Sequence, residues 1–137
     1  MVAMEKMKEF FKENDKLAQH LGIELLELAP GFAKASMTVT PQLLNGVNTA
    51  HGGAIFSLAD LVFAAACNSH NQISVAINVS INFVKAVLPN TTLIAEGHEV
   101  SLNSRLGVYD VKVTDESGDL VATFEGLAYR KKDPLVK

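Results

Sequence analysis

Residues 52–67 read GGAIFSLADLVFAAAC, and this stretch determines how the rest of the chain must be arranged. All but one of its side chains are apolar, small or hydroxylated, which predicts a helix buried on nearly every face. The exception is Asp60, at the centre of the run. Aspartate rarely occupies a core position, because burying an ionised carboxylate costs free energy unless the group is paired. Asp60 is therefore the first candidate catalytic residue, with a structural carboxylate that caps a neighbouring element as the alternative.

The segment that leads into this helix, residues 45–53, reads NGVNTAHGG. The first turn of a helix carries N–H groups without intrahelical partners and the positive end of the macrodipole, so it stabilises an oxyanion placed there. Gly52 and Gly53 leave that position open to a ligand. Taken alone, His51 is more typical of a structural hydrogen-bonding group than of a catalyst. Asn45 fits turn initiation with Gly46 and contact with a substrate equally well.

Composition limits the class of protein. A chain of 137 residues with 48% hydrophobic content predicts one globular domain over residues 1–137, divided into a helix over 1–21 and a core over 22–132. A net charge of -3 argues against nucleic acid as a partner. Cys67 has no partner for an internal disulfide and fits a small core residue, and the N-terminus lacks a signal-peptide pattern, so we expect a cytoplasmic protein. The apolar run is shorter than the roughly 20 residues of a membrane span.

Periodicity along the chain changes from helical to alternating. Apolar residues at helical spacing predict an amphipathic N-terminal helix that ends near Gly22. Alternating residues then predict two strands up to Pro41. After the apolar run, a long strand is expected at 73–83, followed by strands at about 91–100, 106–114 and 120–129, with Ser117-Gly118-Asp119 as a hairpin turn. This order predicts an α+β fold in which an antiparallel sheet of five to six strands wraps the apolar helix.

The helix also predicts a partner. A single sheet covers one side of a helix that is apolar on nearly every face, so a second copy of the chain is the simplest cover for the rest. Gly52 and Asp60 are separated by roughly 12 Å along one helix axis, whereas an oxyanion donor and a base must both act within about 3 Å of one reacting group. Two antiparallel copies would bring Gly52 of one subunit opposite Asp60 of the other, which predicts a homodimer with two shared sites.

Several of these segments carry a resemblance to a known family. The chain resembles the phenylacetic acid degradation type of hotdog-fold thioesterase over most of its length after about residue 40, through Asn45, His51-Gly52-Gly53, Phe56-Ser57-Leu58-Ala59-Asp60, Ala66-Cys67-Asn68-Ser69, Ile81-Asn82-Phe83-Val84-Lys85 and Gly107-Val108-Tyr109-Asp110. The resemblance implies a hotdog fold and a dimer, often paired into a tetramer, that hydrolyses acyl-coenzyme A (acyl-CoA) thioesters. It also implies that no metal or redox cofactor takes part.

The resemblance implies roles for particular residues. Asp60 would be the catalytic carboxylate, and Gly52 would donate the backbone N–H that polarises the thioester carbonyl. Asn45 and His51 would line the reacting group, with Gly53 in the same glycine pair.

Further residues are expected to bind other parts of the substrate. Ser74 matches a hydroxyl that orients water in some relatives, and Lys85 matches a basic residue of the family, whereas Ala86 stands where the commoner pattern has proline. Lys85 and Arg105 are the candidates for the phosphates of coenzyme A. No metal site is expected, because the histidines lack ligand spacing: His20, His51, His70 and His98.

The expected reaction suits so sparse a site. A thiolate leaves readily because the pKa of its conjugate acid is near 8.5, so one carboxylate and one oxyanion donor suffice. Asp60 can act as a general base or as a nucleophile, and the sequence leaves both open, together with the choice between an aryl, phenylacetyl-type acyl group and a short or medium aliphatic one. The alternatives are a hotdog dehydratase or hydratase, whose HFPG signature is absent, and a non-catalytic acyl-CoA sensor. A sensor is disfavoured because the region before Gly22 is too short for a helix-turn-helix and a linker.

Overall fold

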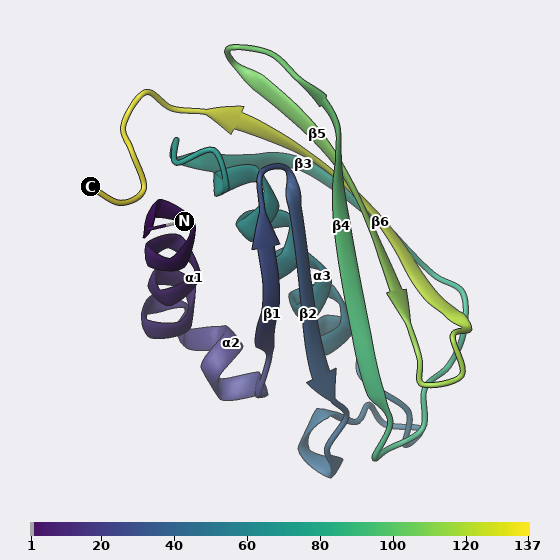
Figure 1. Ribbon diagram of the computed structural model, residues 1–137. Helices are drawn as coiled ribbons and strands as arrows, with labels where there is room; N and C mark the ends of the chain where they lie inside the picture. The colour runs from purple at the N-terminus through teal and green to yellow at the C-terminus, as the bar shows by residue number, and fades with distance from the viewer. Residues whose placement is uncertain (1) are drawn as a thin grey trace.

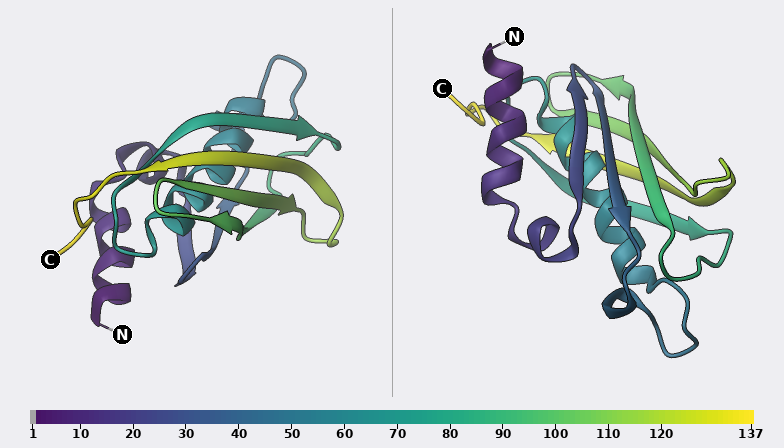
Figure 2. Two further views of the ribbon diagram at one scale, coloured as in Figure 1. Left: turned by 90° about the horizontal axis from the view of Figure 1, so that it is seen from above. Right: turned by 60° about the horizontal axis from the view of Figure 1, so that its bottom comes forward.

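The computed structural model describes residues 2–137, and one antiparallel sheet forms its frame (Figure 1). The six strands lie in the order β1-β2-β4-β5-β6-β3, and each paired neighbour runs antiparallel. The curved sheet wraps around α3 (Figure 2). In chain order the elements are α1 (Val2–Asn14), α2 (Lys16–Leu21), β1 (Glu24–Ala29), β2 (Phe32–Thr38), the 3-10 turn η1 (Pro41–Leu43), α3 (Gly52–Asn68), β3 (Ser74–Phe83), β4 (Thr92–Leu102), β5 (Leu106–Thr114) and β6 (Leu120–Arg130). The expected α+β architecture is thereby confirmed.

The N-terminal segment is two helices, so the expectation of one helix over residues 1–21 is wrong, and Met1 lies outside the described residues. The break falls at Asp15, whose backbone is extended and whose Oδ1 accepts a hydrogen bond from the N–H of Ala18 at 3.0 Å. An aspartate that caps a new helix competes with continuation of the old one, which the apolar periodicity does not reveal. Gly22 ends α2 in the left-handed conformation, as predicted.

The expected regular alternation of residues 73–83 is interrupted. A bulge at Ile77 shifts the register of β3 against β6, so the odd-numbered residues before and after it face opposite sides of the sheet. Phe83 pairs with Ala122 and points toward the start of α3, with its ring 3.3 Å from the position of a Cβ on Gly52. The bulge is therefore what aims Phe83 at that helix.

The central helix packs closely on the sheet because glycines lie beneath it. A Cβ on Gly126 would come within 2.6 Å of the Phe63 ring, and one on Gly97 within 2.6 Å of Val62. These two strand positions have no side chain, so α3 approaches the backbone of β4 and β6. The buried side chains of α3 join those of β2, β4, β5 and β6 in one core.

Two surfaces of the single chain remain partly uncovered. The face of α3 turned away from the sheet carries half-buried Ser57, Asp60 and Ala64, whereas half-buried Phe56 packs on Phe124 of β6. The second is β3, which pairs with β6 on one side and with no other strand of residues 2–137. Along β3, the large apolar side chains that remain exposed are Val75, Ile77 and Phe83. None of the helices within the described part of the chain is long and apolar enough to cross a membrane.

Candidate active site

The start of α3 is organised by His51. Its Nδ1 accepts a hydrogen bond from the backbone N–H of Gly53 at 2.8 Å, and its carbonyl oxygen accepts from Ala54 and Ile55. The backbone N–H of Gly52 donates to no group of residues 2–137. Because Nδ1 is an acceptor, the ring proton of neutral His51 lies on Nε2, and the ring is exposed. The first turn thus presents one unpaired backbone N–H beside an imidazole N–H.

The loop before this helix is held by Asn45. Its Oδ1 accepts hydrogen bonds from the N–H groups of Val47 and Thr49, at 3.0 and 3.2 Å, and its Nδ2 donates to Thr49 Oγ1 at 2.9 Å. This is the turn-forming role that the sequence indicates for asparagine. The same residue also lines a hollow at the helix start, so both readings of Asn45 remain compatible with its position.

That hollow, which we call the Phe83 hollow, has a volume of about 390 Å³. Its walls come from the 45–50 loop, from the first turn of α3 and from the chain that follows β3, and they include Asn45, Gly52, Phe83 and Lys85. A ligand in this hollow would lie next to the unpaired N–H of Gly52. Four of the residues that the sequence singled out or matched to the family therefore meet at one place.

Asp60 lies two turns further along the same helix. It is half-buried, and its carboxylate accepts no hydrogen bond from the described residues, so within this chain it caps no neighbouring element. Burial raises the pKa of Asp60 above its ordinary value, and the charge of Asp15 raises it further. Because α3 is continuous from Gly52 to Asn68, Asp60 is roughly 12 Å along the axis from Gly52. A single chain does not bring the two groups together.

The remaining candidates lie apart from the helix start or are already paired. Lys85 Nζ forms ion pairs with Asp115 Oδ2 at 2.6 Å and Asp119 Oδ2 at 2.8 Å. Arg105 lies in the β4–β5 hairpin, where its carbonyl accepts from the N–H of Arg130. Arg130 pairs with Ser74 at the first residue of β3, so Arg105 and Lys85 lie toward opposite ends of that strand.

Ser74 lies at the C-terminal end of α3 and is buried. Its backbone N–H donates to Asn68 Oδ1 at 2.9 Å, and its Oγ donates to the carbonyl of Gln72 at 3.1 Å. Within one chain Ser74 is therefore distant from the helix start, and its hydroxyl hydrogen is already used.

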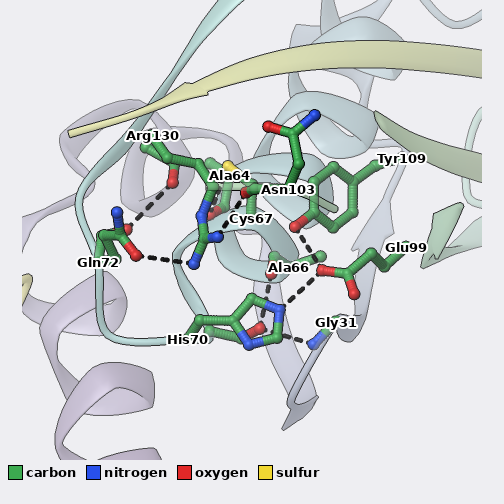
Figure 3. Close-up of polar contacts among 12 residues, drawn as sticks. Gly31, Ala64, Ala66, Cys67, His70, Gln72, Glu99, Asn103, Tyr109 and Arg130 are labelled. Carbon is green, nitrogen blue, oxygen red and sulfur yellow. Dashed lines mark hydrogen bonds and ion pairs between the residues drawn. The ribbon is translucent and has the colours of Figure 1, made fainter. Parts of the chain in front are cut away.

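A polar cluster at that same end of α3 was not expected from the sequence (Figure 3). Glu99 Oε1 accepts hydrogen bonds from the Tyr109 hydroxyl and from His70 Nε2, each at 2.7 Å. Partial burial opposes the charged form of Glu99, but these two hydrogen bonds lower its pKa overall. The three residues of this cluster come from β4, β5 and the loop after α3, so no local sequence spacing could have revealed the cluster.

Two further features of the described residues concern the cysteine and possible metal ligands. Burial, reinforced by the charge of Asp60, raises the pKa of the Cys67 thiol to about 12, which makes this cysteine a poor nucleophile near neutral pH. No group of three or more His, Cys, Asp or Glu side chains in residues 2–137 is arranged to hold a metal ion.

A helix wrapped by a six-stranded antiparallel sheet is the hotdog architecture, and the open N–H at its glycine-rich start suits the hydrolysis of thioesters. The sequence pattern of the thioesterase superfamily matches residues 47–122, and the chain belongs to this family, as an enzyme of its phenylacetic acid degradation (PaaI-like) type. The resemblance inferred from the motifs is confirmed.

Individual relatives agree with this assignment. The chain is 42% identical to a putative esterase of Archaeoglobus fulgidus over 93% of its own length and 82% of the relative. It is 41% identical to the acyl-coenzyme A thioesterase PaaI of Escherichia coli over 86% of its own length and 84% of the relative. The solved structure of E. coli PaaI superposes with a TM-score of 0.93 at 36% identity and covers 96% of both chains. A Streptococcus mutans protein solved with acetyl-CoA bound is 26% identical, with a TM-score of 0.79, over 82% of this chain and 90% of the other.

Proposed function

We propose that this thioesterase hydrolyses acyl-CoA thioesters at a site built from two subunits, with Gly52 of one and Asp60 of the other. The observation that carries the proposal is the unpaired N–H of Gly52 beside the Phe83 hollow, at the start of a helix whose next N–H is capped by His51. A helix N-terminus favours the negative charge that develops on a thioester oxygen under attack. The acyl-CoA thioesterase name of E. coli PaaI and the acetyl-CoA bound to the S. mutans protein support the substrate class.

The need for two subunits follows from distance. The separation of roughly 12 Å between Gly52 and Asp60 is too large for both to act on one carbonyl. The free edge of β3, with exposed Val75, Ile77 and Phe83, suits pairing with the same strand of a second copy. An antiparallel pairing would extend the sheet, cover the open face of α3 and bring the two α3 helices side by side in opposite directions.

The reaction requires little further machinery. In one route Asp60 takes a proton from water, the oxygen of that water bonds to the thioester carbon, and the C–S bond breaks to release the CoA thiolate. In the other route a carboxylate oxygen of Asp60 attacks the carbon, the thiolate leaves, and water hydrolyses the resulting anhydride. Asp60 has no hydrogen-bond partner among residues 2–137, which suits both routes because its oxygens can meet water or the carbonyl. Neither route uses a metal or redox cofactor.

Contacts to the rest of the substrate come from both ends of the fold. Asn45, His51 and Gly53 lie next to Gly52 and are proposed to surround the thioester. Lys85 uses two of its three ammonium hydrogens on Asp115 and Asp119, so one remains for a CoA phosphate. In an antiparallel dimer, Arg105 of one subunit would approach the Lys85 end of the other, which would let both cations meet the phosphates.

Ser74 is proposed to act from the partner in the same way, with a hydroxyl lone pair accepting from water. An aryl, phenylacetyl-type acyl group and pairing of dimers into a tetramer complete the proposal, with residues 1–137 forming one domain. The family resemblance supports the acyl group and the tetramer, and the composition supports the single domain.

The test is thiol release from a panel of aryl- and alkyl-CoA thioesters by wild type and by Asp60→Asn. Asparagine keeps the size of the side chain and removes the base, so turnover should fall by about 100-fold or more. Gly46→Ala serves as a matched control, because a Cβ there meets nothing within 4 Å. Binding of CoA compounds without turnover by wild type would replace the proposal with a non-catalytic acyl-CoA binding role.

A further inference from the structure

A second hollow lies against a different face of α3 from the Phe83 hollow. We call it the Leu17 hollow, and its volume is about 280 Å³. Its walls include Leu17 and Leu21 of α2, Leu43 and Leu44 at the end of η1, and His51 and Gly53. No Asp, Glu, Lys or Arg side chain of the described residues lines it. The hollow is therefore predominantly apolar and touches the start of α3.

Leu17 of α2 is exposed beside the hollow. Leu17 is 57% exposed, although Ala18, next to it on α2, is buried in the core. Its side chain borders the hollow, so an apolar group that filled the hollow would remove this leucine surface from water. An apolar ligand that covers Leu17 would therefore be bound more tightly, because this apolar surface leaves water.

The hollow adjoins the proposed site at the start of α3. His51 and Gly53, which are joined by the 2.8 Å hydrogen bond at the helix start, both line it, and Gly52 lies between them in the chain. The Phe83 hollow reaches the same Gly52 and contains Lys85, whereas no Lys or Arg of residues 2–137 lines the Leu17 hollow. A thioester bound across the start of α3 would accordingly have its CoA arm in the Phe83 hollow and its acyl group in the Leu17 hollow.

We propose that the Leu17 hollow binds the acyl group and that α2 thereby selects uncharged, predominantly apolar acyl groups. This inference rests on the proposed hydrolysis of acyl-CoA thioesters. Its volume lies near the lower end of the roughly 300–1000 Å³ of small-molecule sites, which suits part of a ligand such as a phenylacetyl or medium-chain acyl group. A larger cleft of about 670 Å³ between α1 and β1 is lined by several charged residues and by no residue of the helix start.

Charge near α2 also disfavours one class of substrate. Asp15 caps α2 through its bond to the N–H of Ala18, and its negative charge contributes to the raised pKa of Asp60. Asp15 lies two residues before Leu17, and Asp60 lies about one helical turn beyond Ser57, which lines the hollow. An acyl group that ends in its own carboxylate, such as succinyl, would be repelled and would find no cation in the hollow.

The experiment uses two non-hydrolysable thioethers, S-(2-phenylethyl)-CoA and S-methyl-CoA, and measures the dissociation constant of each by calorimetry. Their ratio isolates the contribution of the acyl position, because both share the CoA arm. We expect the phenylethyl compound to bind more tightly to wild type, and Leu17→Ala to reduce this preference by about tenfold. Val100→Ala is the control, because Val100 is 59% exposed on β4 and does not line the hollow. Leu17→Trp should shift hydrolysis toward shorter acyl groups.

The outcomes separate this inference from the proposed function. If the ratio of the two dissociation constants in Leu17→Ala and Leu17→Trp equals that of the wild type, the inference is overturned, even if the enzyme hydrolyses thioesters. A change of oligomeric state in Leu17→Ala with an unchanged ratio would make the hollow a subunit contact and overturn it as well. A ratio that depends on Leu17 in a protein without thioesterase activity would support the hollow as the acyl site and refute hydrolysis. Hydrolysis of succinyl-CoA as rapid as that of phenylacetyl-CoA would contradict the charge argument.

Discussion

His51 Nδ1 accepts a hydrogen bond from the backbone N–H of Gly53 at 2.8 Å, while the N–H of Gly52 remains without a partner in the described residues. The side chain thus satisfies one orphan donor of the helix and leaves its neighbour available. It also fixes the proton of neutral His51 on Nε2, where it can be donated to a substrate. The structural role of His51 therefore belongs to Nδ1, and the proposed contact with substrate belongs to Nε2.

The two nitrogens of His51 can be separated by mutation. His51→Ala removes the cap and should lower the free energy of unfolding by about 0.5–2 kcal/mol, together with kcat/KM. His51→Asn restores a cap acceptor without the Nε2 proton, so stability should recover while kcat/KM stays low. Thermal melts and kinetics on the same samples distinguish the capping role of His51 from its role as a proton donor to substrate. Wild-type kinetics in His51→Asn would make His51 a cap and nothing more.

Gly52→Ala tests the oxyanion donor. The new Cβ would lie 3.3 Å from the ring of Phe83, which is half exposed and can shift, so we expect little change in the free energy of unfolding. The methyl group would nevertheless occupy space next to the unpaired N–H, and kcat should fall by about tenfold or more. Gly46→Ala, in open space, should retain full activity. Equal activity of the two variants would remove Gly52 from the mechanism.

Asp60 should make the protein less stable as it ionises. Its folded pKa is raised above the ordinary value of 3.8, so the folded state holds the proton more tightly than the unfolded state. The contribution to stability is complete below the unfolded pKa and is lost as pH rises through the folded pKa. Asp60→Asn should therefore raise Tm at pH 7 by roughly a few degrees. At pH 3, where the carboxyl is already protonated, Tm should not rise. A lower Tm at pH 7 would show that the carboxylate is structural.

The same raised pKa sets the pH dependence of catalysis. Both routes require ionised Asp60, so kcat/KM of wild type should fall on the acid side at a pH above 3.8. The midpoint should move down when the charge of Asp15 is removed in Asp15→Asn, because that charge helps to raise the pKa of Asp60. Asparagine retains the cap of α2, which limits the change in structure. An unchanged midpoint would mean that another group controls the acid limb.

Subunit complementation tests the shared site. Asp60→Asn and Gly52→Ala are each expected to impair both sites of a homodimer. After the two variants are unfolded together and refolded, half of the dimers should be mixed, and each mixed dimer should contain one intact site. Activity should therefore return to about one quarter of the wild-type value. Recovery no greater than the sum of the separate variants would place the whole site within one chain.

Disruption of the β3 edge tests the proposed pairing. Ile77 occupies the bulge and is 55% exposed, and Ile77→Lys would place a charge on the strand edge. We expect this variant to sediment as a monomer and to lose activity, whereas Val100→Lys should keep the oligomeric state of the wild type. An active Ile77→Lys monomer would contradict both the pairing and the two-subunit site.

Local pattern was sufficient for much of the fold. The boundaries of β5 match the expected 106–114, and the hairpin at Ser117-Gly118-Asp119 connects β5 and β6 as expected. The expectations that were wrong concern places where a single interaction overrides the periodicity of the sequence. The cap made by Asp15 divides the N-terminal helix, and the bulge at Ile77 reverses the facing of β3.

The sequence by itself determined the central helix, the carboxylate within it and the glycine-rich start, because these depend on residue types at short spacing. Tertiary structure alone decided that His51 caps Gly53, that Phe83 lies over Gly52, and that Lys85 is paired with Asp115 and Asp119. It also decided the cluster of His70, Glu99 and Tyr109. The physical reason is that these contacts join strands and loops far apart in the chain, and their partners are fixed by sheet order and by a one-residue bulge rather than by any local repeat.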